Sequence, residues 1–136
     1  MSRRIVRRVV TAGRKTSLGS ASPSREFCVL FEDDGETGYF YALQSSRKDN
    51  QILDMVNLYT VDPGSDPVRH DEMGIVWSQD GSKVMLLLNE YPQAVFDFQA
   101  KRGYCRTNDP NVPRRERDTW HPEDHSWSDA VCQWFR

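Results

Sequence analysis

Cysteine is scarce in this sequence. It occurs only at Cys28, Cys105 and Cys132, and no two of these residues have a Cys-x-x-Cys spacing. An odd number of cysteines without paired spacing is not the pattern of a small secreted domain built on disulfides. We therefore expect three reduced thiols in a cytosolic protein.

Long apolar runs and nucleotide-binding motifs are absent as well. No segment approaches the roughly 20 apolar residues of a membrane span, and Met1 to Lys15 has arginines but not the apolar run of a signal peptide. We expect neither secretion nor membrane insertion. The chain also has no Gly-rich phosphate loop, no dinucleotide fingerprint and no Gly-x-Ser-x-Gly motif.

Charge is distributed unevenly along the 136 residues. Residues 1–15 contain six basic residues and no acid, residues 26–99 contain fourteen acids and four bases, and residues 101–118 contain six bases and three acids. The basic ends could lie across the acidic body and lower its self-repulsion. The alternative is that they bind nucleic acid or an acidic partner.

Turn signals predict short antiparallel strands. Asp34-Gly35 and Asp80-Gly81 each separate two apolar runs, and Asp-Gly favours tight hairpins because glycine accepts a positive φ. A third turn at Asn89–Pro92 completes a three-stranded meander over residues 73–99, since proline cannot donate to a ladder. Weaker strand candidates are residues 4–10, 16–21 and 55–60, with polar loops over 45–51 and 61–71.

The strands at 27–31 and 84–88 are apolar on both faces, so they should be covered on both sides. An antiparallel sheet achieves this by closing into a small barrel or by packing as two layers. We predict a mainly β protein: a strongly bent antiparallel sheet or small barrel of the Sm or SH3 kind, with a short C-terminal helix.

The last thirty residues differ in character from the strands. Residues 107–125 contain three prolines and many charges and are expected to form an extended strap, whereas residues 126–136 form a short amphipathic helix. We therefore expect a β domain over residues 1–106, with the strap and helix of residues 107–136 packed on the same domain.

Four carboxylates cluster in the first hairpin: Glu32, Asp33, Asp34 and Glu36. Such a cluster could hold Ca²⁺, but its spacing is not that of an EF-hand, and turn chemistry explains the same residues. We expect a structural hairpin in which Tyr39 and Tyr41 belong to the core. The outward carboxylates are then candidates for contact with a protein partner.

Two further groups of side chains are of the types found in metal sites and in acid–base catalysis. Cys105, His121, His125 and Cys132 have the side chains of a structural zinc site, but their spacings are long and irregular, and we expect no metal or cofactor. Glu32 and Asp97 could serve as acid and base in a small hydrolase, although any acidic β protein offers such pairs. We assign no catalytic residue.

Three strings carry a resemblance: FEDDGETGYFYAL from Phe31, VWSQDG from Val76 and AVFDF from Ala94. They resemble a family of small bacterial domains of unknown function, over residues 11–100, so that the strap and helix would lie outside it. The resemblance implies no catalytic residues. The expected topology is also similar to Sm-like bent barrels, and this analogy does not license a function.

Two functional hypotheses follow. The first is a non-enzymatic binding module of a bacterial cytosol that engages a protein through its acidic face or an exposed hairpin edge. The second is an Sm-like binder of RNA or single-stranded nucleic acid. Its contacts would be basic residues from both ends of the chain: Arg3, Arg4, Arg7, Arg8, Arg114, Arg115 and Arg117.

Overall fold

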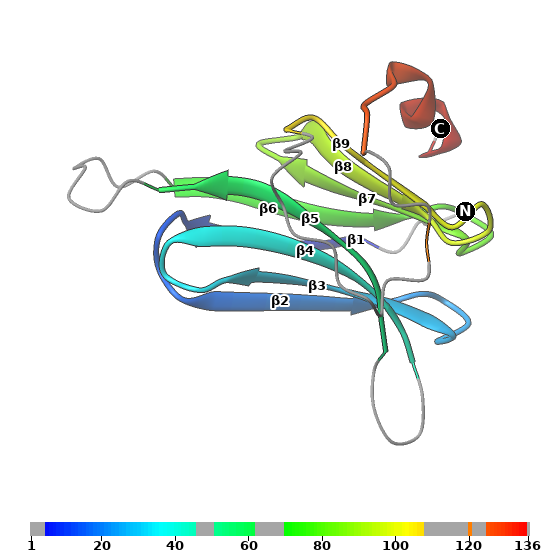
Figure 1. Cartoon of the computed structure of the whole chain (residues 1–136), viewed down its shortest axis with the longest axis horizontal. Helices are drawn as coiled ribbons and strands as arrows, with labels where there is room; N and C mark the ends of the chain where they lie inside the picture. Colours follow the sequence, from blue (N-terminus) through cyan, green and yellow to red (C-terminus); the bar gives the residue numbers. More distant parts are fainter. Residues whose placement is uncertain (1–4, 46–50, 62–69, 108–119, 121–124, 136) are drawn as a thin grey trace.

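The structure is a computed structural model that describes residues 5–45, 51–61, 70–107, 120 and 125–135. Two antiparallel sheets make up most of it (Figure 1). The five-stranded sheet has the order β1 (Ile5–Thr11), β6 (His70–Trp77), β7 (Lys83–Leu88), β8 (Tyr91–Asp97) and β9 (Arg102–Cys105). The four-stranded sheet has the order β2 (Thr16–Ala21), β3 (Phe27–Asp33), β4 (Thr37–Gln44) and β5 (Gln51–Thr60).

The core lies between the two sheets. Leu18, Phe31, Phe40 and Val56 form one cross-strand row of the four-stranded sheet, and all four side chains are buried. The ring of Phe40 stacks on Phe96 of β8 with 5.0 Å between ring centroids. The Trp77 indole also crosses the layers, because its Nε1 donates a 2.9 Å hydrogen bond to Ser20 Oγ. Aromatic packing and one buried hydrogen bond thus fix how the sheets sit on each other.

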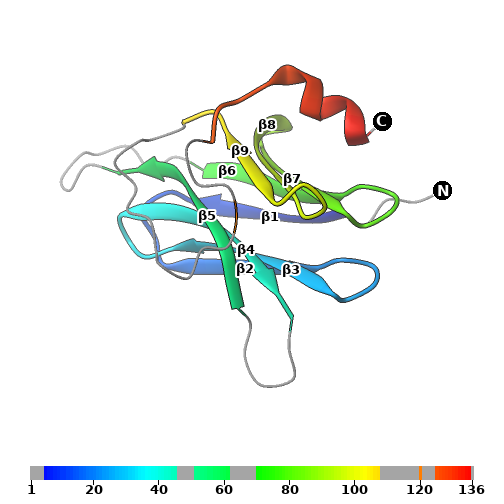
Figure 2. The same ribbon diagram turned by 45° about the vertical axis from the view of Figure 1, so that its right-hand side comes forward.

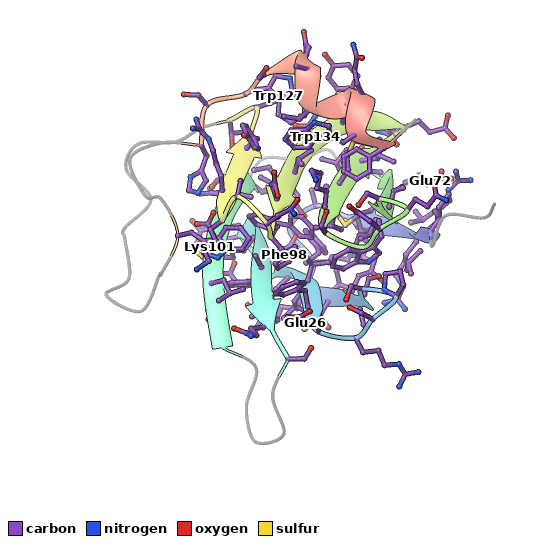
Figure 3. The ribbon with its side chains drawn as sticks, turned by 90° about the vertical axis from the view of Figure 1, so that its right-hand side faces the viewer. Glu26, Glu72, Phe98, Lys101, Trp127 and Trp134 are labelled. Carbon is purple, nitrogen blue, oxygen red and sulfur yellow. The ribbon has the colours of Figure 1, made fainter. Side chains whose placement is uncertain are left out.

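A seven-residue 3₁₀ helix, η1 (Asp129–Phe135), covers the outer face of the five-stranded sheet (Figure 2). Val131 and Phe135 are buried against a cluster on β6, β7 and β8 that consists of Val76, Met85 and Val95. Trp127 and Trp134 lie on the same side, whereas Glu26 lies at the opposite end of the molecule (Figure 3). The helix therefore removes apolar surface of one sheet from water.

The Arg106 side chain secures this helical segment. Its guanidinium lies 4.3 Å from the ring centroids of both Tyr91 and Trp127, and its Nη2 is 3.5 Å from Asp129 Oδ1. The Trp127 indole donates a 2.8 Å hydrogen bond to the same Asp129 oxygen. Cation–π contacts and an ion pair thus join the residue that follows β9 to β8 and to the start of η1.

The prediction of a mainly β protein with a C-terminal helix is confirmed. The sheets form two packed layers, and the nine described strands do not close into a barrel, because no ladder joins β5 to β9 although the two strands lie close together. The three turns occur where expected. Asn89 and Glu90 both have positive φ, at 53° and 66°, which suits a two-residue hairpin.

Some boundaries differ from expectation. β5 starts at Gln51 and β6 at His70, both within segments expected to be loops, and β9 was not expected. Pro92 lies inside β8, where a register shift between Leu86 and Leu87 accommodates it. Most of the strap lies outside the described residues. The described part of the chain has no helix with the length and apolar character that a membrane crossing requires.

Gly38 tests the packing of the first hairpin. A Cβ atom at this position would lie 2.6 Å from the Tyr59 ring, so Gly38→Ala should lower the free energy of unfolding by about 1–3 kcal/mol. At Gly19 of β2 the nearest atom to a Cβ is 3.7 Å away, so Gly19→Ala should be close to neutral. Urea unfolding of both variants checks this. Equal stabilities would contradict the close approach of Tyr59 to β4.

The hairpin between β6 and β7 gives a pH-dependent prediction. Hydrogen bonds from the backbone N–H of Ser82 and from the hydroxyls of Ser78 and Ser82 lower the pKa of Asp80 to about 2. Because this pKa lies below the unfolded value, the stabilisation is present above about pH 4 and is lost as the pH falls towards 2.

Asp80→Asn should therefore cost about 1 kcal/mol of unfolding free energy near pH 7, after allowance for solvent screening, and much less near pH 2. Urea titrations at both pH values measure the difference, with Glu90→Gln as an exposed carboxylate control. A cost that does not change with pH would refute this role of Asp80.

Candidate functional site

The outer face of the four-stranded sheet is the candidate site. Strand pairing arranges its side chains in three rows that cross the sheet. The first row is Ser17, Glu32, Tyr39 and Asn57; the second is Gly19, Leu30, Tyr41 and Met55; the third is Ala21, Cys28, Leu43 and Ile52. Since η1 packs on the other sheet, no described helix or strand lies over this face (Figures 1 and 2).

This face is unusually apolar. An antiparallel sheet with one face in water normally alternates apolar inward positions with polar outward ones. Here the outward positions of β3 and β4 are Cys28, Leu30, Glu32, Tyr39, Tyr41 and Leu43. Four of these are only half-buried apolar or aromatic side chains, and the Tyr39 and Tyr41 rings lie 6.0 Å apart. The second and third rows are thus apolar, with Leu30 and Tyr41 half-buried and with Leu43 and Met55 buried.

The tyrosines of β4 correct a sequence-based expectation. Tyr39 and Tyr41 were expected in the core, but the core position on this strand is Phe40, which is fully buried. Because successive side chains of a strand point to opposite faces, both tyrosines lie on the outer face. The unbroken apolar run in the sequence was the available signal, and it was interpreted as burial on both sides.

Asp33 is separated from the other acidic residues of the first hairpin. It is 2% exposed, and its carboxylate accepts hydrogen bonds from Gly13 N (2.8 Å), Gly35 N (2.8 Å) and Tyr59 Oη (2.7 Å). The carboxylate therefore joins the β1–β2 turn, the β3–β4 hairpin and β5. Asp33 was expected on an outward, partner-facing surface, but its carboxylate is buried within the fold.

The remaining three carboxylates lie near one end of the outer face. Asp34 accepts hydrogen bonds from the backbone N–H of Thr37 (2.9 Å) and Glu36 (3.0 Å), which lower the pKa of its carboxyl below 3.8. Glu36 is exposed at the same hairpin, and Glu32 is half-buried directly across from Tyr39. The hairpin therefore keeps negative charge beside the apolar rows.

Asp54 and His125 form an acid–histidine pair between β5, an edge strand of the four-stranded sheet, and the segment before η1. His125 Nε2 is 2.9 Å from Asp54 Oδ2 and 3.0 Å from Oδ1, and Asp54 is almost fully buried. A Cβ at Gly103 would lie 2.5 Å from Asp54 Oδ2, so glycine lets the carboxylate approach β9 closely. No local pattern in the sequence predicts that Asp54 and His125 meet.

The four residues weighed as a zinc site are not assembled in the part of the chain that is described. Cys105 is 1% exposed, and its Sγ contacts Asn57 O (3.8 Å) and Thr107 Oγ1 (3.1 Å). Its backbone N donates a hydrogen bond to His125 O, but Cys132 lies on η1 in a different cluster. His121 lies outside the described residues. No group of three potential metal ligands occurs among those that are described.

The carboxylate pair considered for a hydrolase is also not brought together. Glu32 lies on the outer face of the four-stranded sheet, whereas Asp97 belongs to the other sheet. The buried Asp97 accepts hydrogen bonds of 3.0 Å from Gln99 N and Ala100 N and so forms the turn before β9.

The expected nucleic-acid contacts can be placed only in part. Arg7 and Arg8 lie on β1, an edge strand of the five-stranded sheet, and the Arg8 guanidinium donates a 3.1 Å hydrogen bond to Ser17 O. The other candidates, Arg3, Arg4, Arg114, Arg115 and Arg117, lie outside the described residues. Binding of RNA through the basic ends therefore stays a prediction.

Comparison with known proteins gives a family and no activity. A model of the family described as "Uncharacterized protein conserved in bacteria (DUF2251)" matches residues 10–136. The match includes the strap and the helix, which were expected to lie outside the resemblance. An uncharacterized protein of Haemophilus influenzae is 47% identical over 93 residues, which are 68% of this chain and 58% of that protein. No solved structure matches, and the likeness to Sm-like barrels is not confirmed.

The Asp54–His125 pair generates a prediction about stability. Removing one partner leaves a buried polar group without the other, so Asp54→Asn and His125→Ala should each lower the unfolding free energy by about 2–4 kcal/mol. A double-mutant cycle measured by denaturant unfolding should give a coupling of about 1–3 kcal/mol. Additive effects would show that the two side chains do not depend on each other.

Proposed function

Since the chain belongs to the DUF2251 family of uncharacterized proteins conserved in bacteria, we propose that it is a non-enzymatic binding module that engages a protein partner. The binding surface is the outer face of the four-stranded sheet. The proposal places this interaction in the bacterial cytosol, in keeping with three cysteines that form no disulfide.

The observation that carries the proposal is the apolar character of that face. The half-buried Leu30 and Tyr41 lie side by side in its middle row. The half-buried Cys28 lies in the next row, across from Leu43, which is 8% exposed. Exposed apolar patches rimmed by polar residues mark interaction sites on soluble proteins. The other sheet supplies the comparison, because there η1 buries Val76, Met85 and Val95. No described helix or strand does the same on the four-stranded sheet, and we infer that a partner covers that face.

The use of polar residues supports binding without catalysis. The buried carboxylates of Asp33, Asp54 and Asp97 each accept hydrogen bonds from, or pair with, groups that hold turns and segments together. The buried thiol of Cys105 contacts a backbone carbonyl and a hydroxyl. A catalytic group has to reach a substrate, and these groups are occupied within the fold.

An exposed glycine and an exposed valine allow a matched test. Gly19 lies on the outer face of the four-stranded sheet, and Val9 is 64% exposed on β1, the edge strand of the other sheet. A Cβ at Gly19 would meet no atom closer than 3.7 Å. Gln should fit at either exposed position without disturbing the core.

Gly19→Gln should weaken partner binding by about tenfold or more, because it places a polar side chain in the middle row of the interface. Val9→Gln should change binding by less than about twofold, because Val9 is 64% exposed on the other sheet. A photo-crosslinking residue at Leu30 in living bacteria captures the partner, and titration calorimetry with the purified partner measures both variants. A partner that binds both variants equally, or no crosslink at Leu30, would refute the proposal.

A further inference from the structure

The four-stranded sheet has charge of one sign only. Its described strands contain Glu32, Asp33 and Asp54 and no lysine or arginine, whereas the five-stranded sheet has Arg7, Arg8, Lys83 and Arg102. Asp33 and Asp54 point inward and have partners in the fold. Glu32 is therefore the charged side chain on the outer face itself.

The place of Glu32 in the first row gives it a specific neighbour. Glu32 pairs directly with Tyr39 across β3 and β4, and residues paired in this way have Cβ atoms about 4.5–5.5 Å apart. A carboxylate thus stands beside a half-exposed aromatic ring. An arginine guanidinium can form a bidentate contact with the Glu32 carboxylate and stack on the Tyr39 ring.

Further negative charge lies at the same end of the face. Asp34 and Glu36 are exposed at the β3–β4 hairpin, and the turn hydrogen bonds that favour the ionised form of Asp34 keep it charged at neutral pH. Lys15 lies against Gly35, where its Cγ would be 3.6 Å from an added Cβ. The Arg8 guanidinium also reaches this end, through its hydrogen bond to the carbonyl of Ser17. The described contacts thus place two bases, Lys15 and Arg8, near three acids at this end.

We propose that the partner docks with a segment that carries arginine beside apolar side chains. The proposal rests on the protein-binding function above and adds the chemistry of the partner. The apolar side chains of the segment cover Leu30 and Tyr41, and its guanidinium pairs with Glu32 and stacks on Tyr39. Asp34 and Glu36 attract the positive segment to this end of the sheet.

The same charges argue against other occupants. A second copy of the chain, docked face to face, would place two acidic hairpins near two faces that have no base in their strands, and like charges at an interface oppose association. A nucleic acid would bring phosphates to the same carboxylates. An arginine-bearing protein segment is the occupant that this charge pattern fits.

The test uses a library of random dodecapeptides displayed on phage, selected on the full-length protein and counter-selected on Gly19→Gln. We expect selected peptides to be enriched in arginine and apolar residues. Glu32→Gln should weaken the binding of a purified selected peptide by about tenfold, since it removes a charge-assisted contact, and should reduce the salt dependence of binding. Glu90→Gln, on the exposed β7–β8 hairpin, is the control and should change little.

Cys28 provides an independent readout at the site. Its half-buried thiol lies in the third row of the outer face. A bound peptide should slow alkylation of Cys28 by iodoacetamide and leave the rate at Cys132, on η1, unchanged. A peptide that protects Cys132 instead would place the binding elsewhere and overturn the proposal.

The outcomes separate the two proposals. Selected peptides that need Gly19 but carry no excess of arginine, or that bind Glu32→Gln as tightly as the original protein, would refute the arginine partner and leave the binding face in place. Self-association that is abolished by Gly19→Gln would also refute the arginine partner and leave the binding face in place. The occupant would then be a second copy of the chain. Peptides that never discriminate against Gly19→Gln would refute the binding face itself.

Discussion

Each of the two sheets has apolar side chains on both of its faces, and the fold follows from how these faces are removed from water. A sandwich of two sheets buries one face of each, which here encloses Phe31, Phe40 and Trp77. The outer faces remain, and burying apolar area there contributes about 25 cal/mol per Å² removed from water. The chain uses η1 to cover the outer face of the five-stranded sheet. The outer face of the four-stranded sheet, with Leu30 and Tyr41 at its centre, has no comparable cover among the described elements.

The acidic residues of the β3–β4 hairpin are divided between the inner and outer faces of the four-stranded sheet. They form one cluster in the sequence, but successive side chains of a strand point to opposite faces. Asp33 points inward and joins three segments of the chain, because it accepts hydrogen bonds from the backbone N–H of Gly13 and Gly35 and from the Tyr59 hydroxyl. Glu32 points outward beside Tyr39. A carboxylate that stabilises the fold and a carboxylate on the outer face are thus adjacent in the chain.

Much of the fold could be predicted from local sequence signals. Asp-Gly turns and apolar runs located the strands of both hairpins, because these signals act over a few residues. The short strand β9 was missed since its four residues, Arg102–Cys105, carry little apolar pattern and depend on pairing with β8. The start of β5 was missed for the same reason, because pairing with β4 extends it to Gln51.

The candidate site was harder to predict than the strands. Apolar residues on both faces of β3 and β4 were correctly recognised, but a sequence cannot say whether the second face is covered by its own chain or by another. The Asp54–His125 contact joins residues 71 positions apart and leaves no local signal. Contacts of this range are set by the packing of the two sheets and of the segment before η1.

The most direct measurement is covalent footprinting with a photoactivated diazirine, done on the purified protein and inside the bacterium that encodes it. Leu30, Tyr39 and Tyr41 should be modified in the purified protein and protected in the cell. Tyr91, which is 54% exposed on the other sheet, should be modified to the same extent in both. Equal modification of the outer face in the cell and in solution would contradict the claim that a partner covers it.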